Sequence, residues 1–503
     1  MYSVFGLTFL SGLVITPIIV GAIGTEQFGV WSLIGSIFGF VGLLDLGLAA
    51  TVVRFAAEQR GRDARDETSV TASTALALYI VLASVAFLVG VLLAWLLPVF
   101  VELSPDVVQP AQVALLLMLG SFAIRYPLGM FGGLLAGQQR YDLLNLGGIV
   151  GTILYFALAG GILYFFGGGI VVLAAITVGT TLIRLAIPLA WLRRELPELR
   201  ISRSLASRAE ARTLLRFSLR NLLIQVAARV LFQTDVIVVG IIFGGIAAGV
   251  FGIPSKLFAL AFGVAIVSSN LLFPLLSELE GADERWRQER YLVSGIRLGV
   301  SFVVAISTAL ILLPERFLHA WLPDDFDVEG AAPILSVLMV SLLFAQPGHL
   351  LGQFLVARGQ HGRLAVARLA VVVANVLLSI ALAHVIGLWG VALATLVTEG
   401  ISAALVVPLL VRRASGVAIR GLVAAWVRPL VLGLAASPLL LLFDRLTPID
   451  SLLVFVAVAG AWAALYSALV WRFGLEEAER RTIRSSFTPA TVRPATVDDQ
   501  VVP

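Results

Sequence analysis

Apolar runs of about 20 residues or more recur along almost the whole sequence. An α-helix of that length is needed to cross ~30 Å of hydrocarbon at 1.5 Å rise per residue. Of the 503 residues, 59% are hydrophobic and only 13% are charged, whereas a soluble fold needs more charge on its surface. The chain is therefore predicted to be an all-α polytopic membrane protein.

The runs predict about fourteen transmembrane helices. Their approximate ranges are 2–23, 27–53, 72–98, 111–136, 143–166, 169–192, 216–243, 247–276, 291–313, 331–356, 364–386, 388–411, 423–443 and 451–472. Arginines gather in every second loop, after the even-numbered helices, while the alternate loops are neutral or acidic apart from Arg316 and Arg445. The positive-inside rule then predicts that both termini are cytoplasmic.

The first half of the sequence resembles the second. Phe28-Gly29-Val30-Trp31 matches Ala248-Gly249-Val250-Phe251 at an offset of 220 residues, and Gly137-Gln138 matches Gly359-Gln360 at 222. Each repeat holds six spans, so both enter the membrane from the same side, which predicts two parallel bundles related by a pseudo-twofold axis along the membrane normal. Such a pair of bundles is typical of an alternating-access carrier with its substrate between them.

The expected organisation follows from the spans and the repeat. It comprises an N-terminal six-helix bundle (1–195), a basic cytoplasmic linker (196–215), a C-terminal six-helix bundle (216–413), two additional transmembrane helices (414–475) and a cytoplasmic, disordered tail (476–503). The tail is charged and then rich in Thr and Pro, which is typical of a segment without a core.

Several segments resemble Wzx-type polysaccharide flippases of the multidrug/oligosaccharidyl-lipid/polysaccharide (MOP) exporter superfamily. They are Glu26–Leu33, Leu43–Leu48, Val53–Phe55, Arg216–Leu219, Asp235–Gly240, Phe273–Ser277 and Gly387–Thr395. The resemblance extends to about residue 475 and implies a flippase for polyprenyl-diphosphate-linked oligosaccharides, acting in cell-surface polysaccharide biosynthesis such as that of lipopolysaccharide O-antigen or exopolysaccharide. It also implies a central cationic cavity, the cytoplasmic membrane of a bacterium or archaeon, and a glycan polymerase or glycosyltransferases as candidate partners.

Six charged residues lie deep within predicted spans, where a charge usually faces a cavity or a partner. They are Asp45, Arg125, Arg229, Asp235, Lys256 and Glu399. The repeat places uncharged residues opposite all six, so packing of the bundle does not by itself require them. Asp45, Asp235 and Glu399 are candidates for H⁺ or Na⁺ coupling, or for ion pairs.

The candidate substrate-binding residues are basic or polar. Asn221, Gln225, Arg229 and Gln233 recur every four residues and share one helix face, which predicts a stripe lining water or substrate. The alternative is a set of hydrogen bonds between helices. Lys256, the sole lysine, is a candidate contact for a diphosphate, or it forms an ion pair with Asp235 or Asp45.

Two arginines complete this set. Arg125 lies about fourteen residues into the fourth span and is too deep to reach the interface easily. Arg54 belongs to a family-like segment, but it also lies near a cytoplasmic end, as Arg184 does. The alternative for both arginines is that their long side chains reach the membrane–water interface and fix the topology of the protein.

The sequence also limits the other functions. It has no cysteine, and His349 and His384 lack the spacing of metal ligands, so no metal site or cofactor is expected. The basic residues are spread over loops, which does not favour nucleic acid as a partner; membrane lipids are the expected surroundings. The alternatives are a MATE-like multidrug or cation antiporter and, with less support, a membrane glycan polymerase or ligase.

Overall fold

The computed structural model describes residues 2–42, 47–62, 64–447 and 449–487. Within these ranges the side chains of residues 2–5, 7–10, 65, 217, 219–232, 268 and 485–487 are not described. The described part of the chain is almost entirely helical and contains no strand.

The helices of the first half, with the short helix that follows them, are α1 (Tyr2–Val41), α2 (Leu48–Gly61), α3 (Arg65–Phe100), α4 (Pro105–Gly137), α5 (Tyr141–Phe166), α6 (Ile170–Glu195) and η2 (Arg203–Leu205). Those of the second half are α7 (Arg208–Gly281), α8 (Arg285–Leu312), α9 (Pro314–Trp321), α10 (Val328–Ala357), α11 (His361–Ile386), α12 (Leu388–Ile401), η3 (Ser402–Val406) and α13 (Val407–Ser415). The chain continues through α14 (Ile419–Leu446), α15 (Leu452–Leu469), η4 (Val470–Gly474) and α16 (Glu477–Phe487).

Twelve helical stretches of the described chain are long and apolar enough to cross a membrane. Two of their helices are longer than one crossing needs, since α1 has 40 residues and α7 has 74. Each contains a glycine with non-helical backbone angles, Gly24 (φ 77°, ψ 166°) and Gly244 (φ 82°, ψ −174°), which glycine adopts at little cost. These glycines divide α1 and α7 next to the predicted ends of spans one and seven. The polytopic all-α fold is confirmed, and about fourteen spans are compatible with it.

Helix boundaries repeat at an offset of 220 residues. Gly24 and Gly244 are one such pair, and α5 (141–166) and α11 (361–386) begin and end in register at the same offset. Positive φ angles also recur, at Gln139 (61°) and Gly359 (70°), and at Gly167 (67°) and Gly387 (76°). The similarity of the two halves of the sequence therefore extends to their turns and helix ends.

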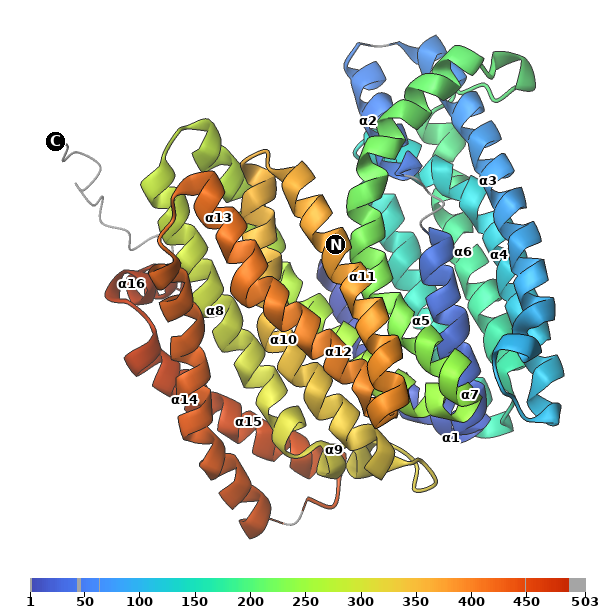
Figure 1. The fold of residues 1–503 in the computed structure, drawn as a ribbon. Helices are drawn as coiled ribbons and strands as arrows, with labels where there is room; N and C mark the ends of the chain where they lie inside the picture. Colours follow the sequence, from blue (N-terminus) through green and yellow to red (C-terminus); the bar gives the residue numbers. More distant parts are fainter. Residues whose placement is uncertain (1, 43–46, 63, 448, 488–503) are drawn as a thin grey trace. The chain divides into compact units, whose positions relative to one another are not determined.

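The chain forms two compact units. Unit 1 comprises residues 1–260, 321–338 and 365–398, and unit 2 comprises 261–320, 339–364 and 399–503. In unit 1, α4 packs against α2, α3 and α6, and α5 packs against α6 (Figure 1). In unit 2, α14 packs against α8 and α15. The bounds of these two units differ from those of the predicted bundles at 1–195 and 216–413. The two bundles therefore stay a prediction.

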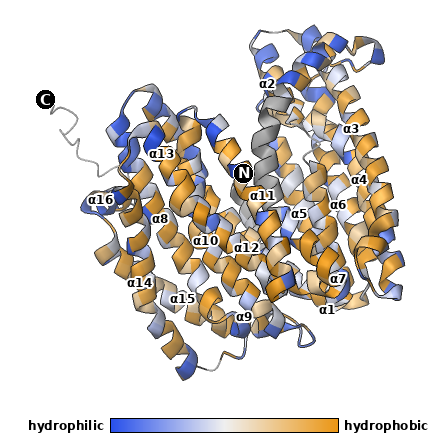
Figure 2. Cartoon of the chain, in the orientation of Figure 1, coloured by the Kyte–Doolittle hydropathy of each residue, from blue (hydrophilic) through white to orange (hydrophobic). Residues whose placement is uncertain are grey.

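Apolar residues cover the long helices, and hydrophilic residues gather at helix ends and in α16 (Figure 2). Large side chains on the helix surfaces are exposed, including Leu88 (68%), Trp95 (72%) and Phe166 (86%). Water would strongly disfavour so much exposed apolar surface, whereas lipid solvates it. The surface therefore confirms a multi-pass membrane protein.

The backbones of α1 and α7 meet closely within unit 1. A Cβ atom added to Gly29 would overlap the carbonyl oxygen of Gly245, and one added to Gly249 would overlap that of Thr25. Residues 25 and 245, like 29 and 249, are 220 positions apart, so the two contacts are equivalent under the repeat. The contact requires glycine because any side chain would separate the helices.

A buried ion-pair cluster holds the C-terminal helix in unit 2. Arg297, halfway along α8 and only 2% exposed, donates to Glu476 (2.6 Å) and to Glu479 of α16 (2.8 Å). Glu479 also accepts from the backbone N–H of Glu476 (2.8 Å). A buried guanidinium is tolerated only with such charge-assisted partners.

We predict that Gly29→Ala destabilises the protein by about 1–3 kcal/mol or prevents folding, because the new methyl group must push two backbones apart. The midpoint of thermal unfolding in detergent measures the effect. Gly35→Ala is the matched control, since Gly35 lies in the same helix with nothing within 4 Å of the added Cβ; alanine there should be neutral or slightly stabilising. Equal midpoints for the two variants would contradict the close contact.

Candidate functional site

A buried polar cluster surrounds Asp235 in unit 1. Asp235, on α7, accepts a hydrogen bond from the Thr395 hydroxyl of α12 at 2.7 Å. Asn375, on α11, donates from Nδ2 to Thr395 and to Thr398, both at 3.2 Å. These four side chains are all less than 9% exposed. Helices α7, α11 and α12 thus bring one carboxylate, one amide and two hydroxyls together inside the protein.

The cluster has more acceptors than donors. Asp235 Oδ1 and Asn375 Oδ1 are buried without a hydrogen-bond partner among the described residues. Ser379, one turn after Asn375 on α11 and fully buried, lies near the Asp235 carboxyl without a well-formed hydrogen bond. Leaving a buried acceptor unsatisfied costs about 1–3 kcal/mol. Oxygen atoms gathered around a single negative charge suit a proton or a monovalent cation.

The first half of the chain builds the same helices without this cluster. At the offset of 220 residues, Tyr155 and Ala159 correspond to Asn375 and Ser379, and Ile15 corresponds to Asp235. The helices therefore pack without these polar groups, which favours a functional role for Asp235 and its neighbours.

Arg125 lies above an aromatic stack on α4. Its guanidinium is 5.6 Å from the ring centroid of Phe122, which stacks on Tyr126 with centroids 4.9 Å apart. Tyr126 in turn meets Tyr79 of α3 edge-on at 4.7 Å. The Arg125 side chain is exposed and forms no ion pair with a described acidic residue. The aromatic faces stabilise a cation that remains accessible to a ligand.

Arg184 of α6 is a second deep cation close to Arg125. The two guanidinium groups are near enough to interact electrostatically. Arg184 lies eleven residues before the end of α6 at Glu195, or roughly 16 Å along the helix axis. It lines a cavity of about 190 Å³ between α4, α5 and α6 and is exposed. Two neighbouring cations in a membrane repel each other, and an anion between them removes that cost.

Lys256, on α7, has Nζ 5.8 Å from the ring centroid of Phe28 on α1. It is half-buried and forms no ion pair with any acidic residue that the structure describes, Asp235 included. The cation–π contact stabilises the lysine in this position. An anion is therefore a fitting additional partner.

The remaining predicted residues are more scattered. Arg54 is exposed on α2, 5.8 Å from the ring of Phe55, and Glu399 is buried in unit 2. Gln233 packs against Gly39 of α1, where an added Cβ would lie 2.6 Å from its side chain. Asp45 and the side chains of Asn221, Gln225 and Arg229 lie outside the described residues, so the polar stripe on α7 stays a prediction.

Two groups of residues in the site were not predicted from the sequence. Arg184 was predicted to lie near the cytoplasmic end of its span, and the structure places it eleven residues before the end of α6 and close to Arg125. Asn375 and Ser379 are spaced by four, and Thr395 and Thr398 by three, which places each pair on one helix face. Such polar pairs on one face of an otherwise apolar helix are the sequence pattern from which the cluster could have been predicted.

The family model described as "Polysaccharide biosynthesis protein" matches residues 2–280. This is more than half of the 503 residues, and the chain belongs to that family. The resemblance to polysaccharide flippases noted from the sequence is thereby confirmed. No curated protein matches the sequence significantly.

Solved structures with a similar fold include three transport proteins. The lipid II flippase MurJ in its inward closed conformation has a TM-score of 0.74 at 14% identity, with 94% of this chain and 97% of MurJ covered. An inward-facing multidrug-resistance MATE transporter of the MOP superfamily has a TM-score of 0.67 at 18% identity, covering 83% and 95%. A MOP superfamily transporter from Pyrococcus furiosus, described as having a binding pocket of reversed polarity, has 0.58 at 18%, covering 83% and 93%. At these identities the similarity shows the fold.

We predict that Thr395→Val destabilises the protein by about 1–3 kcal/mol, because Asp235 and Asn375 both lose a buried partner. Thermal unfolding compared with Thr152→Val measures this loss. The Thr152 hydroxyl donates only to Gly148 of its own helix, at 2.9 Å, so its removal should have little effect. If both variants unfolded at the same temperature, the cluster would not be a connected hydrogen-bond network.

Proposed function

We propose that this protein moves a polyprenyl-diphosphate-linked oligosaccharide across the cytoplasmic membrane by alternating access, for the synthesis of a cell-surface polysaccharide. Family membership and the MurJ-like and MATE-like fold support transport of this kind. The observation that carries the proposal is the set of deep cations Arg125, Arg184 and Lys256, which have no acidic partner among the described residues.

A diphosphate matches these cations chemically. It bears more than one negative charge and several acceptor oxygens, and guanidinium groups bind such oxygens in pairs. In a membrane of low dielectric constant, neutralising a deep cation is worth far more than in water. In the proposed mechanism the basic residues bind the diphosphate, the polyprenyl chain remains in lipid and the glycan occupies an aqueous cavity.

The same charges argue against the two alternatives. A carrier of cationic drugs needs an accessible acidic site, whereas Asp235 is buried in a hydrogen-bonded cluster and the exposed deep groups are basic. The family and the transporter folds of the similar structures favour transport over a glycan polymerase or ligase. Transport of an anionic lipid therefore fits the accessible groups better.

We predict that Arg125→Gln and Arg184→Gln each slow flipping by about 10- to 100-fold, because each removes one charge-assisted hydrogen bond of ~1.5–3 kcal/mol. The assay uses proteoliposomes that contain a fluorescent polyprenyl-diphosphate oligosaccharide and measures how much becomes accessible to an external glycosidase. Arg285→Gln is the matched control, because Arg285 is exposed at the start of α8 and its ion-pair partner among the described residues is Asp283 (2.9 Å).

Two results would contradict the flippase. One is glycosidase accessibility that does not depend on the wild-type protein. The other is protein-dependent uptake of a cationic dye without movement of the lipid-linked glycan, which would favour the antiporter.

We further propose that Asp235 binds the coupling ion, either Na⁺ or H⁺. One carboxylate and several neutral oxygens balance a single positive charge, and the buried acceptors without donors are the groups that such an ion would satisfy. The ligands would be Asp235 and Asn375, with Ser379 and Thr395 adjacent. Ion binding here would join α7, α11 and α12 and thereby favour one conformation of the carrier.

We predict that Na⁺ raises the thermal unfolding midpoint of the wild type, because an ion that binds only the folded state stabilises it in proportion to RT ln(1 + [Na⁺]/Kd). Asp235→Asn should abolish the shift, whereas Asp444→Asn, which removes a partner of Arg316 (3.2 Å), should preserve it. If the unfolding midpoint depended on pH but not on Na⁺, and Asp235→Asn removed the pH dependence, the coupling ion would be the proton. A shift that persists in Asp235→Asn would refute this site.

A further inference from the structure

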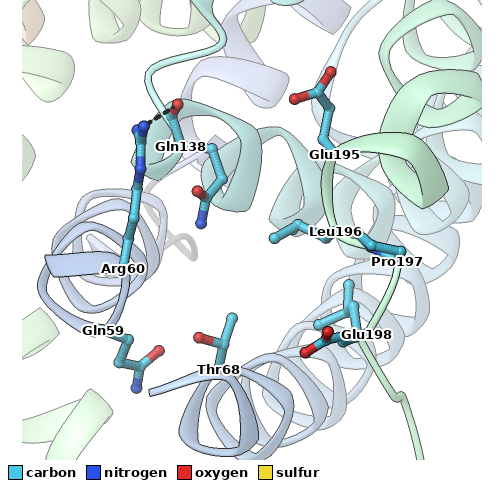
Figure 3. Close-up of a pocket in the computed structure, with 9 residues that line it drawn as sticks. Gln59, Arg60, Thr68, Gln138, Glu195, Leu196, Pro197 and Glu198 are labelled. Atoms are coloured by element: carbon cyan, nitrogen blue, oxygen red, sulfur yellow. Dashed lines mark hydrogen bonds between the residues drawn. The ribbon is translucent and has the colours of Figure 1, made fainter. Parts of the chain in front are cut away.

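A polar pocket lies at one end of the helices of unit 1, away from the deep charges. Its volume is about 320 Å³, within the ~300–1,000 Å³ range of small-molecule sites. Its walls are the end of α2, the start of α3, the end of α4 and the segment that follows α6 (Figure 3). None of the proposed transport residues lines it.

The orientation of the Gln59 amide is fixed by its neighbours. Thr71 donates its hydroxyl hydrogen to the carboxylate of Glu210 (2.9 Å), so it can only accept from Gln59 Nε2 (2.8 Å). Gln59 Oε1 is consequently an acceptor, and it is buried without a partner among the described residues. The residue is 4% exposed and lines the pocket. A ligand that donates a hydrogen bond would satisfy this oxygen.

Other polar groups line the same pocket. Thr68 is buried and donates its hydroxyl to the Ala64 carbonyl at 3.3 Å, which leaves oxygen lone pairs available to accept. Arg60 uses one N–H to bind the backbone oxygen of Gln138 at 2.7 Å and keeps its other donors. The Gln138 amide points into the pocket and has no hydrogen-bond partner in the described chain (Figure 3). The pocket therefore offers both donors and acceptors.

The charges around the pocket are mixed and largely balanced. Glu195 forms an ion pair with Arg140, and the exposed Glu198 and Arg60 carry opposite charges on different walls. Leu196, Pro197 and Leu199 contribute an apolar wall. A neutral ligand with hydroxyl groups on its edge and an apolar face matches this combination, because a hydroxyl both donates and accepts.

The second half of the chain differs at the corresponding place. The helix ends and the positive-φ residues Gln139 and Gly359 align this turn at an offset of 220 residues, not at the 222 of the sequence match between Gln138 and Gln360. Leu279 then corresponds to Gln59, and Glu280 and Arg358 correspond to Arg60 and Gln138. Glu280 and Arg358 form an ion pair at 3.4 Å. The helix ends pack there without Gln59 and Gln138, so packing alone does not account for the pocket's amides.

We propose that this pocket is a binding site for a neutral saccharide of one or two rings. The sugar hydroxyls donate to Gln59 and Thr68 and accept from Arg60 and Gln138, while the apolar face of the ring packs against Leu196 and Leu199. The site is separate from the proposed transport path and does not rest on the proposed function, since free sugar is sufficient to test it.

The test is titration of the full chain in nanodiscs with methyl glucoside, methyl galactoside, N-acetylglucosamine and lactose, followed by saturation-transfer NMR and calorimetry. At least one sugar should bind. Gln59→Leu and Gln138→Ala should each weaken its binding about tenfold, as expected for one lost hydrogen bond. Gln360→Ala, at the matching turn of the second repeat, should bind like the wild type.

Three outcomes would overturn the proposal. They are the absence of binding by every neutral sugar, binding that is unchanged in both Gln59→Leu and Gln138→Ala, and preferential binding of glucose 1-phosphate or methylguanidinium, which would assign the pocket to a charged ligand. Because Gln59 is buried, thermal unfolding of Gln59→Leu checks its fold, and Gln138→Ala tests the site independently should that variant not fold.

Discussion

The contact between the backbones of α1 and α7 is the constraint on which the described site depends. Gly29 and Gly249 allow the two helices to approach within van der Waals distance of each other's carbonyl groups. That proximity brings Lys256 of α7 above Phe28 of α1 and packs Gln233 against Gly39. Small residues permit such packing in membranes, where there is no hydrophobic force between helices and dispersion must replace it. The deep polar groups of α7 are thus positioned by residues that have no side chain.

The internal repeat separates structural requirements from functional ones. Both halves share helix boundaries and positive-φ turns, because these determine where the chain crosses the membrane and reverses. Each deep charge, by contrast, has an uncharged residue at the equivalent position of the other half, and the Asp235 cluster has no counterpart in the first half. A chain that folds the same helices with isoleucine, tyrosine and alanine at the equivalent positions shows that the polar residues are not needed for packing. Ligands therefore explain best why polar and charged residues occupy these positions within apolar helices.

The features that the sequence predicted are those that depend on local pattern. Helix positions and the repeat offset both follow from hydropathy and spacing. The partners of Asp235 do not, because Thr395 is 160 residues away and is brought near only by the packing of α7 against α12. The pocket at Gln59 depends likewise on four separate segments. Its key property is that Gln59 Oε1 has no hydrogen-bond donor among the described residues. This follows from the direction of the hydrogen bonds of Thr71, which cannot be predicted from a sequence pattern.

The ion pairs of Arg297 have a consequence for biosynthesis. Its partners Glu476 and Glu479 follow it by 179 and 182 residues, which takes roughly 10–40 s to translate at ~5–20 residues per second. During that interval α8 carries a charge halfway along its length without the carboxylates that later neutralise it. The pairing that fixes Arg297 in unit 2 can therefore form only after residues 476–479 have been synthesised. Completion of the C-terminus, rather than synthesis of α8, then determines when this charge is neutralised.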